Sequence, residues 1–340
     1  GFCKMIDLIK ELTESYGPSG REEEVQKVVL KHLEGHIDGH RFDPLGNLLV
    51  WKKGKSDKKV LLDAHIDEIG LVVTNIDDKG FLRVEPVGGV SPYTYVGHRV
   101  KFPKATGVVY YEGETPDEQK KNLSNLTFDH LFVDIGAHDR KEAESLVPIG
   151  TFGVYDSYFH RNGKYLVSKS MDDRIGCAAL VEVLKNLKDP KHTVIGSFSV
   201  QEEIGLVGAS VAAYDFSPQL CVAVDVTDSA DHPKGLKRHA MALGKGPAIK
   251  IKDRASISHR KVVEMLEQAA QKSGVSYQKE VLTFGGTNAA VLQRTKEGIP
   301  SATLSIPTRY VHSPSETVCL DDVEGAVKLL ASFVNLELEF

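Results

Sequence analysis

The 340-residue chain lacks the long apolar runs, paired cysteines and excess positive charge that mark several large classes of protein. No stretch of about 18 apolar residues occurs, which argues against a membrane-spanning helix. The 42 basic and 47 acidic residues give a net charge of −5 without any basic block, which disfavours a nucleic-acid partner. The four cysteines are scattered without a C-x-x-C pair, and the first residues show no secretory pattern. We therefore expect reduced thiols in a cytoplasmic protein that binds neither nucleic acid nor membrane.

Short apolar runs that alternate with helical patterns are the main feature that is present. Helical periodicity occurs at 5–16, 175–187, 206–213, 262–272, 287–294 and 323–334. Strand-like runs occur at 48–52, 60–64, 194–200, 220–226, 275–282 and 302–306. This alternation predicts an α/β fold with a mixed, mainly parallel sheet that helices cover on both faces.

A second helix is expected after the first, because the segment Ser19-Gly20-Arg21-Glu22 fits the pattern of a capping box. In such a box the Ser19 and Glu22 side chains would satisfy the first free backbone amides of a helix that continues to Leu33.

The α/β rhythm is interrupted between residues 69 and 160. This stretch is rich in glycine, proline and β-branched residues, with strand-like runs at 71–74, 81–84, 100–102, 107–111 and 131–135 and one helical piece at 140–146. Short strands with frequent turns predict a small β-barrel or sandwich, of which we expect the barrel. We therefore expect residues 1–68 and 161–340 to form one discontinuous domain, with residues 69–160 inserted as a second.

Potential metal ligands collect where strands and one helix begin or end. They are His65 after the run 60–64, Glu202 and Glu203 after 194–200, Asp225 in 220–226, His312 after 302–306, and Asp172 at a helix start. The carboxyl ends of parallel strands meet at one edge of a sheet, so these side chains are expected to converge. Mixed imidazole and carboxylate ligands suit zinc, cobalt or manganese, and their number favours a two-metal hydrolytic site.

Two further acids near these positions have other expected roles. Asp67 lies two residues after His65, hence on the same face of an extended strand, and could fix the tautomer of that imidazole. Asp173 is expected to cap the helix that begins beside it.

Several motifs resemble those of a known family. K-S-M-D-D-R-I-G at 169–176, Q-E-E-I-G-L-V-G-A at 201–209 and P-T-R-Y-V-H-S-P at 307–314 resemble signatures of the tetrahedral aminopeptidases. These are di-metal glutamyl/leucyl aminopeptidase-like proteins, some of them labelled endoglucanases. L-D-A-H-I-D-E-I-G at 62–70 and G-P-S-G at 17–20 fit as well, so the resemblance covers essentially the whole chain.

The resemblance implies two divalent metal ions per chain, zinc or cobalt first and manganese as a further option. One ion would be held by His65, Asp172 and Asp225, and the other by Asp172, Glu203 and His312, with Asp172 as the bridge. Glu202 would be the general base that deprotonates the metal-activated water and later protonates the leaving amine. The implied substrates are short peptides, and the inserted domain would be a PDZ-like module that builds dimers and a dodecamer.

Three other functions compete with aminopeptidase activity. Related di-metal deacylases and carboxypeptidases use the same ligand order, but their extra domain falls in the later gap, between Asp225 and His312. An inactive metal-stabilised assembly protein is the second, although Glu202 is intact. Endoglucanase activity is unlikely, because it needs two carboxylates free of metal and the single tryptophan, Trp51, offers little sugar-stacking surface.

One position departs from the family pattern. Asn288, in the run F-G-G-T-N-A at 284–289, stands where the family usually carries Asp. Either that carboxylate normally helps to bind the substrate ammonium, or the Gly-Gly-Thr turn simply opens a helix. The basic residues Lys250, Lys252, Arg254 and Arg260 could supply a pocket for acidic side chains, or lie on an exposed face.

Overall fold

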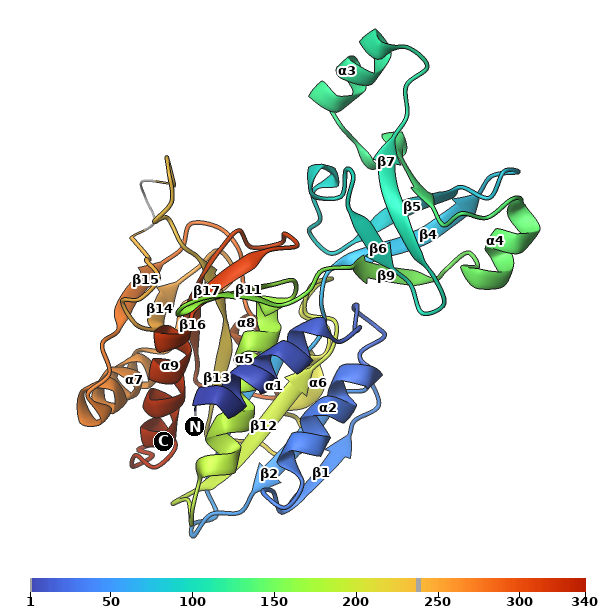
Figure 1. Ribbon diagram of the computed structural model, residues 1–340. Helices are drawn as coiled ribbons and strands as arrows, with labels where there is room; N and C mark the ends of the chain where they lie inside the picture. Colours follow the sequence, from blue (N-terminus) through green and yellow to red (C-terminus); the bar gives the residue numbers. More distant parts are fainter. Residues whose placement is uncertain (1, 237–239) are drawn as a thin grey trace.

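A computed structural model describes residues 2–236 and 240–340. It contains a large α/β body and a β-barrel that projects from one end of it (Figure 1). Among the helices of these residues, none combines the length and apolar character that crossing a membrane requires.

The body is built on a mixed sheet of 11 strands in the order β1-β2-β12-β3-β13-β16-β17-β11-β10, with β14 beside β16 and β15 beside β14. The centre, from β12 through β3 and β13 to β16, is parallel, and the outer pairs are antiparallel except for the parallel pair of β14 and β15. The strands are β1 (Gly39–Phe42), β2 (Leu48–Lys52), β3 (Lys59–His65), β10 (His160–Asn162), β11 (Tyr165–Ser168), β12 (Thr193–Ser199), β13 (Leu220–Asp228), β14 (Ala248–Lys252), β15 (Gln278–Val281), β16 (Ser301–Arg309) and β17 (Glu316–Cys319).

Helices cover both faces of this sheet, as the sequence predicts. On β3, Val60 and Leu62 belong to the larger core cluster, whereas Leu61 points into a second cluster on the opposite face. The larger cluster packs under α1 (Phe2–Glu14), α2 (Glu23–Leu33), α5 (Met171–Asn186), α7 (Arg260–Ser273) and α9 (Leu320–Phe333). The smaller one packs under the short helices α6 (Ala209–Ala212) and α8 (Ala289–Leu292).

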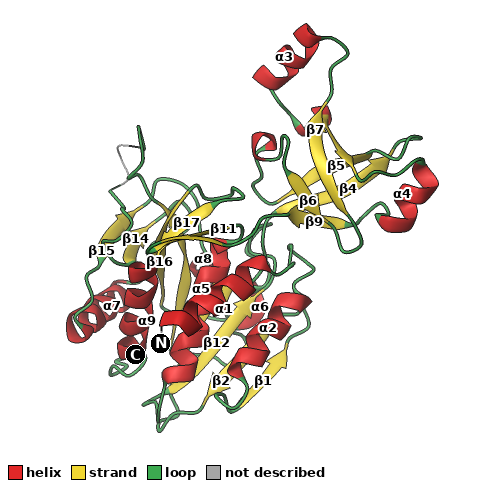
Figure 2. Cartoon of the chain, in the orientation of Figure 1, coloured by secondary structure: helices red, strands yellow, loops and turns green. Residues whose placement is uncertain are grey.

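The barrel closes through six strands in the order β4-β5-β8-β7-β6-β9, all antiparallel to their neighbours. They are β4 (Gly70–Ile76), β5 (Leu82–Val87), β6 (Arg99–Lys101), β7 (Thr106–Tyr111), β8 (Leu131–Asp134) and β9 (Phe152–Tyr155). Two helices, α3 (Pro116–Ser124) and α4 (Arg140–Leu146), and two single turns, η1 (Pro92–Thr94) and η2 (Phe128–His130), decorate it. Figure 2 shows the contrast between this strand-rich unit and the helix-covered body.

The structure differs from the predicted elements at several places, and strands β1, β10, β11, β14 and β17 have no predicted counterpart. The helices expected at 206–213 and 287–294 shrink to four residues each, and before the first of them Leu206 takes a left-handed backbone conformation with φ 59°. Helix α3 and strand β9 were not predicted. Helix α3 buries no residue, so its sequence carries no apolar periodicity.

The expected capping box is also wrong. Helix α2 begins after Glu22, whose side chain makes no cap hydrogen bond. Instead, the Ser19 hydroxyl donates to Asp67 Oδ2 at 2.6 Å, and Glu22 Oε2 accepts from the backbone N–H of Gln201 at 2.9 Å. Ser19 therefore turns toward Asp67, and Glu22 turns toward the segment that precedes Glu202, because tertiary partners outcompete the local ones.

Candidate metal centre

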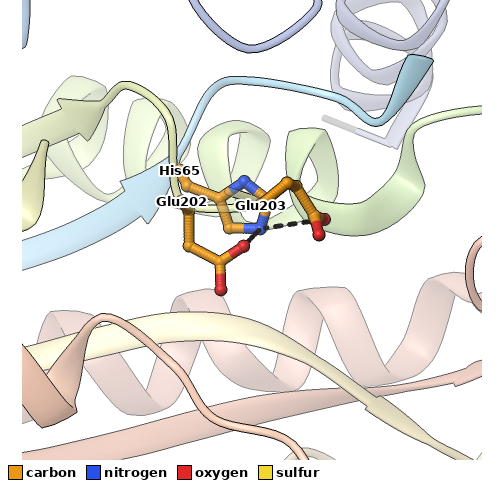
Figure 3. A group of neighbouring side chains, drawn as sticks. All are labelled: His65, Glu202 and Glu203. Carbon is orange, nitrogen blue, oxygen red and sulfur yellow. Dashed lines mark ion pairs between the residues drawn. The ribbon is translucent and has the colours of Figure 1, made fainter. Parts of the chain in front are cut away.

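The predicted site residues converge at the carboxyl edge of the parallel strands. His65 ends β3, Glu202 and Glu203 follow β12, and Asp225 lies on β13. His65 Nε2 lies 2.9 Å from Asp172 Oδ1, 3.2 Å from Glu202 Oε2 and 3.6 Å from Asp225 Oδ1. Figure 3 shows Glu202 and Glu203 turned toward the imidazole of His65, with Glu203 Oε1 at 3.8 Å.

His312 completes the group from the loop after β16. Its Nε2 lies 3.0 Å from Asp172 Oδ2 and 3.2 Å from Glu203 Oε2. Asp172 thus stands between the two imidazoles, with one oxygen toward each. All six residues come together within one cluster, although the first is residue 65 and the last is residue 312 of the chain.

The donor atoms fit divalent ions. Three sets of three donors lie within 4.8 Å of one another: His65 with Glu202 and Glu203, His65 with Asp173 and Asp225, and Asp172 with Glu203 and His312. Two imidazoles with several carboxylates form the kind of donor set that zinc, cobalt and manganese accept. The assignment of individual ligands to each of two ions stays a prediction.

The electrostatics of the cluster point the same way. Burial, together with the neighbouring carboxylates of Glu203 and Asp225, raises the pKa of Glu202 well above its usual value, although His65 opposes this. Burial and Asp172 raise the pKa of Glu203 to about 8. Like charges confined in a dry site resist ionisation. A cluster of this kind therefore requires compensating positive charge, and divalent cations would supply it.

The comparisons with known proteins decide the family. Residues 46–329 match the model of the M42 glutamyl aminopeptidase family. The chain belongs to this family. A lysyl aminopeptidase from Pyrococcus furiosus is 36% identical over 97% of both chains. Among solved structures, an aminopeptidase from the archaeon Desulfurococcus kamchatkensis is 37% identical with a TM-score of 0.93, over 98% of this chain and 95% of that one.

A third relative is informative for its architecture. The TET1 peptidase of Pyrococcus horikoshii, which can assemble into a tetrahedron or a large octahedral shell, is 35% identical with a TM-score of 0.87. The match covers 98% of this chain and all of that one (100%), so it includes the inserted barrel. This M42 protein is therefore a peptide-bond hydrolase of a metal-dependent family, and the fold predicted from its motifs is confirmed.

Asp67 organises one side of the M42 site from a fully buried position. Its Oδ1 lies 3.2 Å from His65 Nδ1, and its two oxygens accept from the backbone N–H groups of Glu202 at 3.0 Å and Glu203 at 3.2 Å. Burial opposes ionisation, but the hydrogen bond and charge of His65 outweigh it and lower the pKa of Asp67. Strand β3 ends at His65, so the contact arises from the turn that follows and not from a shared strand face.

Asp173 does not cap a helix as expected. It lies inside α5, fully buried, where Oδ2 accepts from the backbone N–H of His65 at 3.1 Å. Its Oδ1 has no hydrogen-bond partner among the described atoms, and Asp173 belongs to one of the candidate donor sets. An orphaned buried oxygen beside Asp225 is a further sign that the cluster fits a cation.

Glu316 is a site residue that the motif search missed. From the first position of β17, its Oε1 accepts from the backbone N–H of Asp172 at 3.1 Å, and its Oε2 accepts from that of His312 at 2.7 Å. One buried carboxylate thereby ties together the backbones of two predicted ligands. Its position two residues after the motif at 307–314 gave no local signal, because a Glu in a strand is ordinarily a solvent-facing residue.

Asn288 points into the sheet instead of the site. Its side chain is buried, and Nδ2 donates to Asp63 Oδ2 at 2.8 Å and to Ser199 Oγ at 2.9 Å. Burial raises the pKa of Asp63 to about 6, although the hydrogen bonds from Asn288 and two serines oppose this. The amide of Asn288 therefore donates a hydrogen bond to the buried carboxylate of Asp63. An aspartate at position 288 could donate this hydrogen bond only in its protonated form.

A cavity of about 390 Å³ adjoins the cluster, lined by Asp172, Glu202, Glu203, Asp225 and His312 on one side and by Lys250, Phe284 and the Gly285-Gly286-Thr287 turn on the other. This volume suits a small ligand. Of the four basic residues considered for an acidic-side-chain pocket, Lys250 alone lines it, and its ammonium is already paired with Asp253 at 2.9 Å. Lys252, Arg254 and Arg260 are exposed elsewhere.

Proposed function

We propose that this protein is a co-catalytic di-metal aminopeptidase that removes N-terminal residues from short peptides. The observation that carries the proposal is the convergence of two histidines and four carboxylates in one cluster, in which all members except His65 line the same cavity. In this proposal His65, Asp172 and Asp225 hold one ion, and Asp172, Glu203 and His312 hold the other. Zinc and cobalt suit this donor set best, with manganese as the third candidate.

Bound divalent ions would supply Lewis acidity and make water acidic enough to attack near neutral pH. Glu202 is then the general base: it takes the proton from the attacking water and delivers it to the nitrogen of the leaving peptide. The base must be ionised to accept this proton, and bound cations would favour its ionised form by opposing the burial and the neighbouring carboxylates that raise the pKa of Glu202.

Asp67 and His65 hold this base in place. The carboxylate of Asp67 accepts hydrogen bonds from the backbone N–H groups of Glu202 and Glu203. These bonds fix the backbone of the two glutamates, so that their adjacent side chains can point in different directions. Its carboxylate also lies beside His65 Nδ1, and a proton held there leaves Nε2 available as a donor atom. We therefore assign Asp67 the role of orienting both the imidazole and the catalytic segment.

The position of the insert favours an aminopeptidase over related deacylases and carboxypeptidases. The barrel lies between His65 and Asp172, whereas the stretch from Asp225 to His312 continues the sheet of the body. Glycoside hydrolysis would need free carboxylates and aromatic surface at the site, but Trp51 packs against Phe216 on the smaller core cluster. An inactive assembly protein would have no use for Glu202 beside the cavity.

The test is the release of chromophore from a panel of aminoacyl arylamides. The protein is stripped of metal, assayed, and assayed again after addition of zinc, cobalt or manganese. We expect metal-restored cleavage of substrates with a free amine and no cleavage of amine-blocked ones. Cleavage of blocked substrates would favour a deacylase, and metal binding without any cleavage would favour the assembly protein.

We propose further that residues 69–160 are a PDZ-like assembly module through which the chain forms dimers and a dodecamer. The assembling relative from Pyrococcus horikoshii, which matches along its full length, supports this. The outer face of β7 carries exposed Val108 and Tyr110, which suits a protein contact. Sedimentation that finds only a 37.3 kDa species would contradict the proposal. A cytoplasmic location stays a prediction.

A further inference from the structure

We propose that Gly89, a residue of the inserted barrel, is a positioning residue of the metal centre that acts through His312. This inference rests on the proposed function, because it takes His312 as a metal ligand. It assigns the barrel a role in the site of the body, in addition to any role in assembly.

A hydrogen bond connects the two domains at this point. His312 Nδ1 lies 2.8 Å from the carbonyl oxygen of Gly89, in the loop between β5 and η1. A carbonyl oxygen only accepts, so Nδ1 must carry the proton. In the neutral imidazole this leaves the lone pair on Nε2, which faces Asp172 and Glu203 at 3.0 and 3.2 Å. The barrel carbonyl therefore selects the tautomer that can bind a metal through Nε2.

The contact also restrains the ring. The side chain of His312 is 31% exposed, so without the barrel it would be free to turn toward solvent. Its backbone N–H is fixed by Glu316, which leaves the side-chain torsions as the remaining freedom. Gly89 supplies a second fixed point at the opposite end of the residue, so backbone and ring are both held.

The imidazole of His312 packs so closely against residue 89 that a side chain there would crowd it. A Cβ at this position would stand 3.1 Å from His312 Nδ1 and 3.4 Å from Cε1, closer than most Cβ contacts. Gly89 does not adopt a left-handed backbone conformation, so alanine would cause no backbone strain there. The ring would have to move, and this makes Gly89→Ala a specific probe. Gly88, with φ 84°, would be strained by any substitution and is unsuitable.

Two other hydrogen bonds between body and barrel help to hold the loop between β5 and η1 beside the site. Tyr16 Oη donates to the carbonyl oxygen of Phe152 at 2.7 Å, and Ser157 Oγ donates to that of Pro314 at 2.8 Å. The hydrogen bond from Ser157 to Pro314 restrains the same loop that contains His312. Because Tyr16 donates to the barrel at Phe152 and not to a predicted ligand, Tyr16→Phe removes this interdomain hydrogen bond without adding bulk at the site.

The experiment titrates the metal-free full-length chain with Co²⁺ alone, by calorimetry and by visible absorption. We expect two ions bound by the original protein and one by His312→Ala. Gly89→Ala should bind one ion with unchanged affinity and the other about 10–100-fold more weakly, with an altered absorption band for that ion. Tyr16→Phe should weaken the same ion by a smaller factor, and Ser91→Ala, in the same loop but outside the contact, should match the original.

The outcomes separate the two proposals. If His312→Ala still binds two ions, the ligand assignment fails. If it loses one ion while Gly89→Ala and Tyr16→Phe both keep the original affinities and spectrum, the role of Gly89 is overturned and the proposed function stands. Equal weakening of both ions in Gly89→Ala would also overturn it, since a positioning role through His312 affects one ion. Tyr16→Phe, which keeps its ring, provides the decision if the alanine variant fails to fold.

Discussion

The α/β body and the inserted barrel bury different chemistry. Among the described residues, every buried polar or charged side chain lies outside residues 69–160, apart from the tyrosines of the barrel core. The barrel core consists of aliphatic and aromatic side chains, with Tyr95 stacked on Tyr155 at 4.3 Å between ring centroids. The body, in contrast, encloses carboxylates, imidazoles, Lys169 and Arg174 behind its sheet edge.

This difference separates two uses of a folded interior. Apolar burial stabilises the barrel without any need for partners, at about 25 cal/mol for each Å² of apolar surface removed from water. Buried charges stabilise little by themselves, and each requires a compensating group. Lys169 and Arg174 thus both pair with Glu68, at 2.8 and 2.9 Å, immediately behind the site. The interior of the body thus includes paired charged groups beside the candidate site, whereas the interior of the barrel consists of apolar and aromatic side chains that stabilise its fold.

The largest expected effect concerns the charged side of this comparison. Glu202→Gln should lower kcat by about 10²–10⁴-fold, because an amide of the same shape cannot accept the proton. Metal content and thermal unfolding should stay close to those of the original protein. Steady-state kinetics with metal analysis measure both, and Glu264→Gln, an exposed carboxylate on α7, is the matched control. An unimpaired Glu202→Gln variant would refute the assignment of the base.

The apolar side is tested by Leu131→Ala, in the fully buried core of the barrel. The cavity that this change leaves should lower the free energy of unfolding of the barrel by about 2–5 kcal/mol. Denaturant unfolding measures the change in free energy, and the metal content is determined separately before denaturant unfolds the barrel. Metal content should not change while the barrel remains folded. Ile149→Ala, at a 58% exposed position of the insert, should cost far less, and equal losses would contradict an apolar-core origin.

The buried acids make the pH dependence of the body unusual when metal is removed. The pKa is raised to about 6 for Asp63, about 7 for Glu22 and about 8 for Glu203, by burial in each case and, for the two glutamates, by a neighbouring aspartate. The folded state therefore binds protons more tightly than the unfolded state, and stability is lost as pH rises from about 4 to 8.

Between its unfolded-state and folded-state pKa values, each group lowers the free energy of unfolding by about 1.4 kcal/mol for each pH unit. Urea unfolding of metal-stripped protein across this range measures the fall, and added Zn²⁺ should reduce it because cations replace the bound protons. Glu22→Gln should remove the part of the fall that ends near pH 7, because burial and Asp67 raise the pKa of this acid to about 7. A stability that rises over the same interval would contradict the electrostatic picture.

The smallest expected effect is at α3, which buries no residue. Thr115 caps this helix by accepting the backbone N–H of Glu118 at 3.1 Å. Thr115→Ala should cost about 1 kcal/mol or less, and only locally. Hydrogen exchange of the amides at 116–124 should accelerate while global unfolding stays unchanged. A fall in global stability would mean that α3 is coupled to the barrel core.

Sequence patterns predicted the parts of the molecule that have a local cause. Strand β2 occupies the predicted residues 48–52, because its apolar run between polar residues is short and clearly bounded. Helix α3 was missed because a helix without a buried face has no periodic signal. The convergence of His65, Glu203 and His312 could be expected from the rule that parallel strands end at one edge, and the structure brings them together.

Contacts between distant segments could not be predicted in this way. Glu316 looks like an ordinary strand residue until its oxygens are seen to accept the amides of Asp172 and His312. Ser19 fits a helix cap, yet it binds Asp67. Asn288 stands within a family motif, and its partner Asp63 lies on another strand. In each case two or more chain segments compete for one polar group, and only the packed structure decides which partner wins.

The amino-acid order by itself determined the α/β and barrel segments, the family and the set of chemically competent side chains, because periodicity, turn residues and motif spacing are properties of short stretches. The tertiary structure alone decided which carboxylates lie close enough to raise one another's pKa and which backbone groups restrain them. It also decided that a carbonyl of the barrel meets His312. Those features depend on distances between segments far apart in the chain, and such distances exist only once the hydrophobic cores have fixed the two domains.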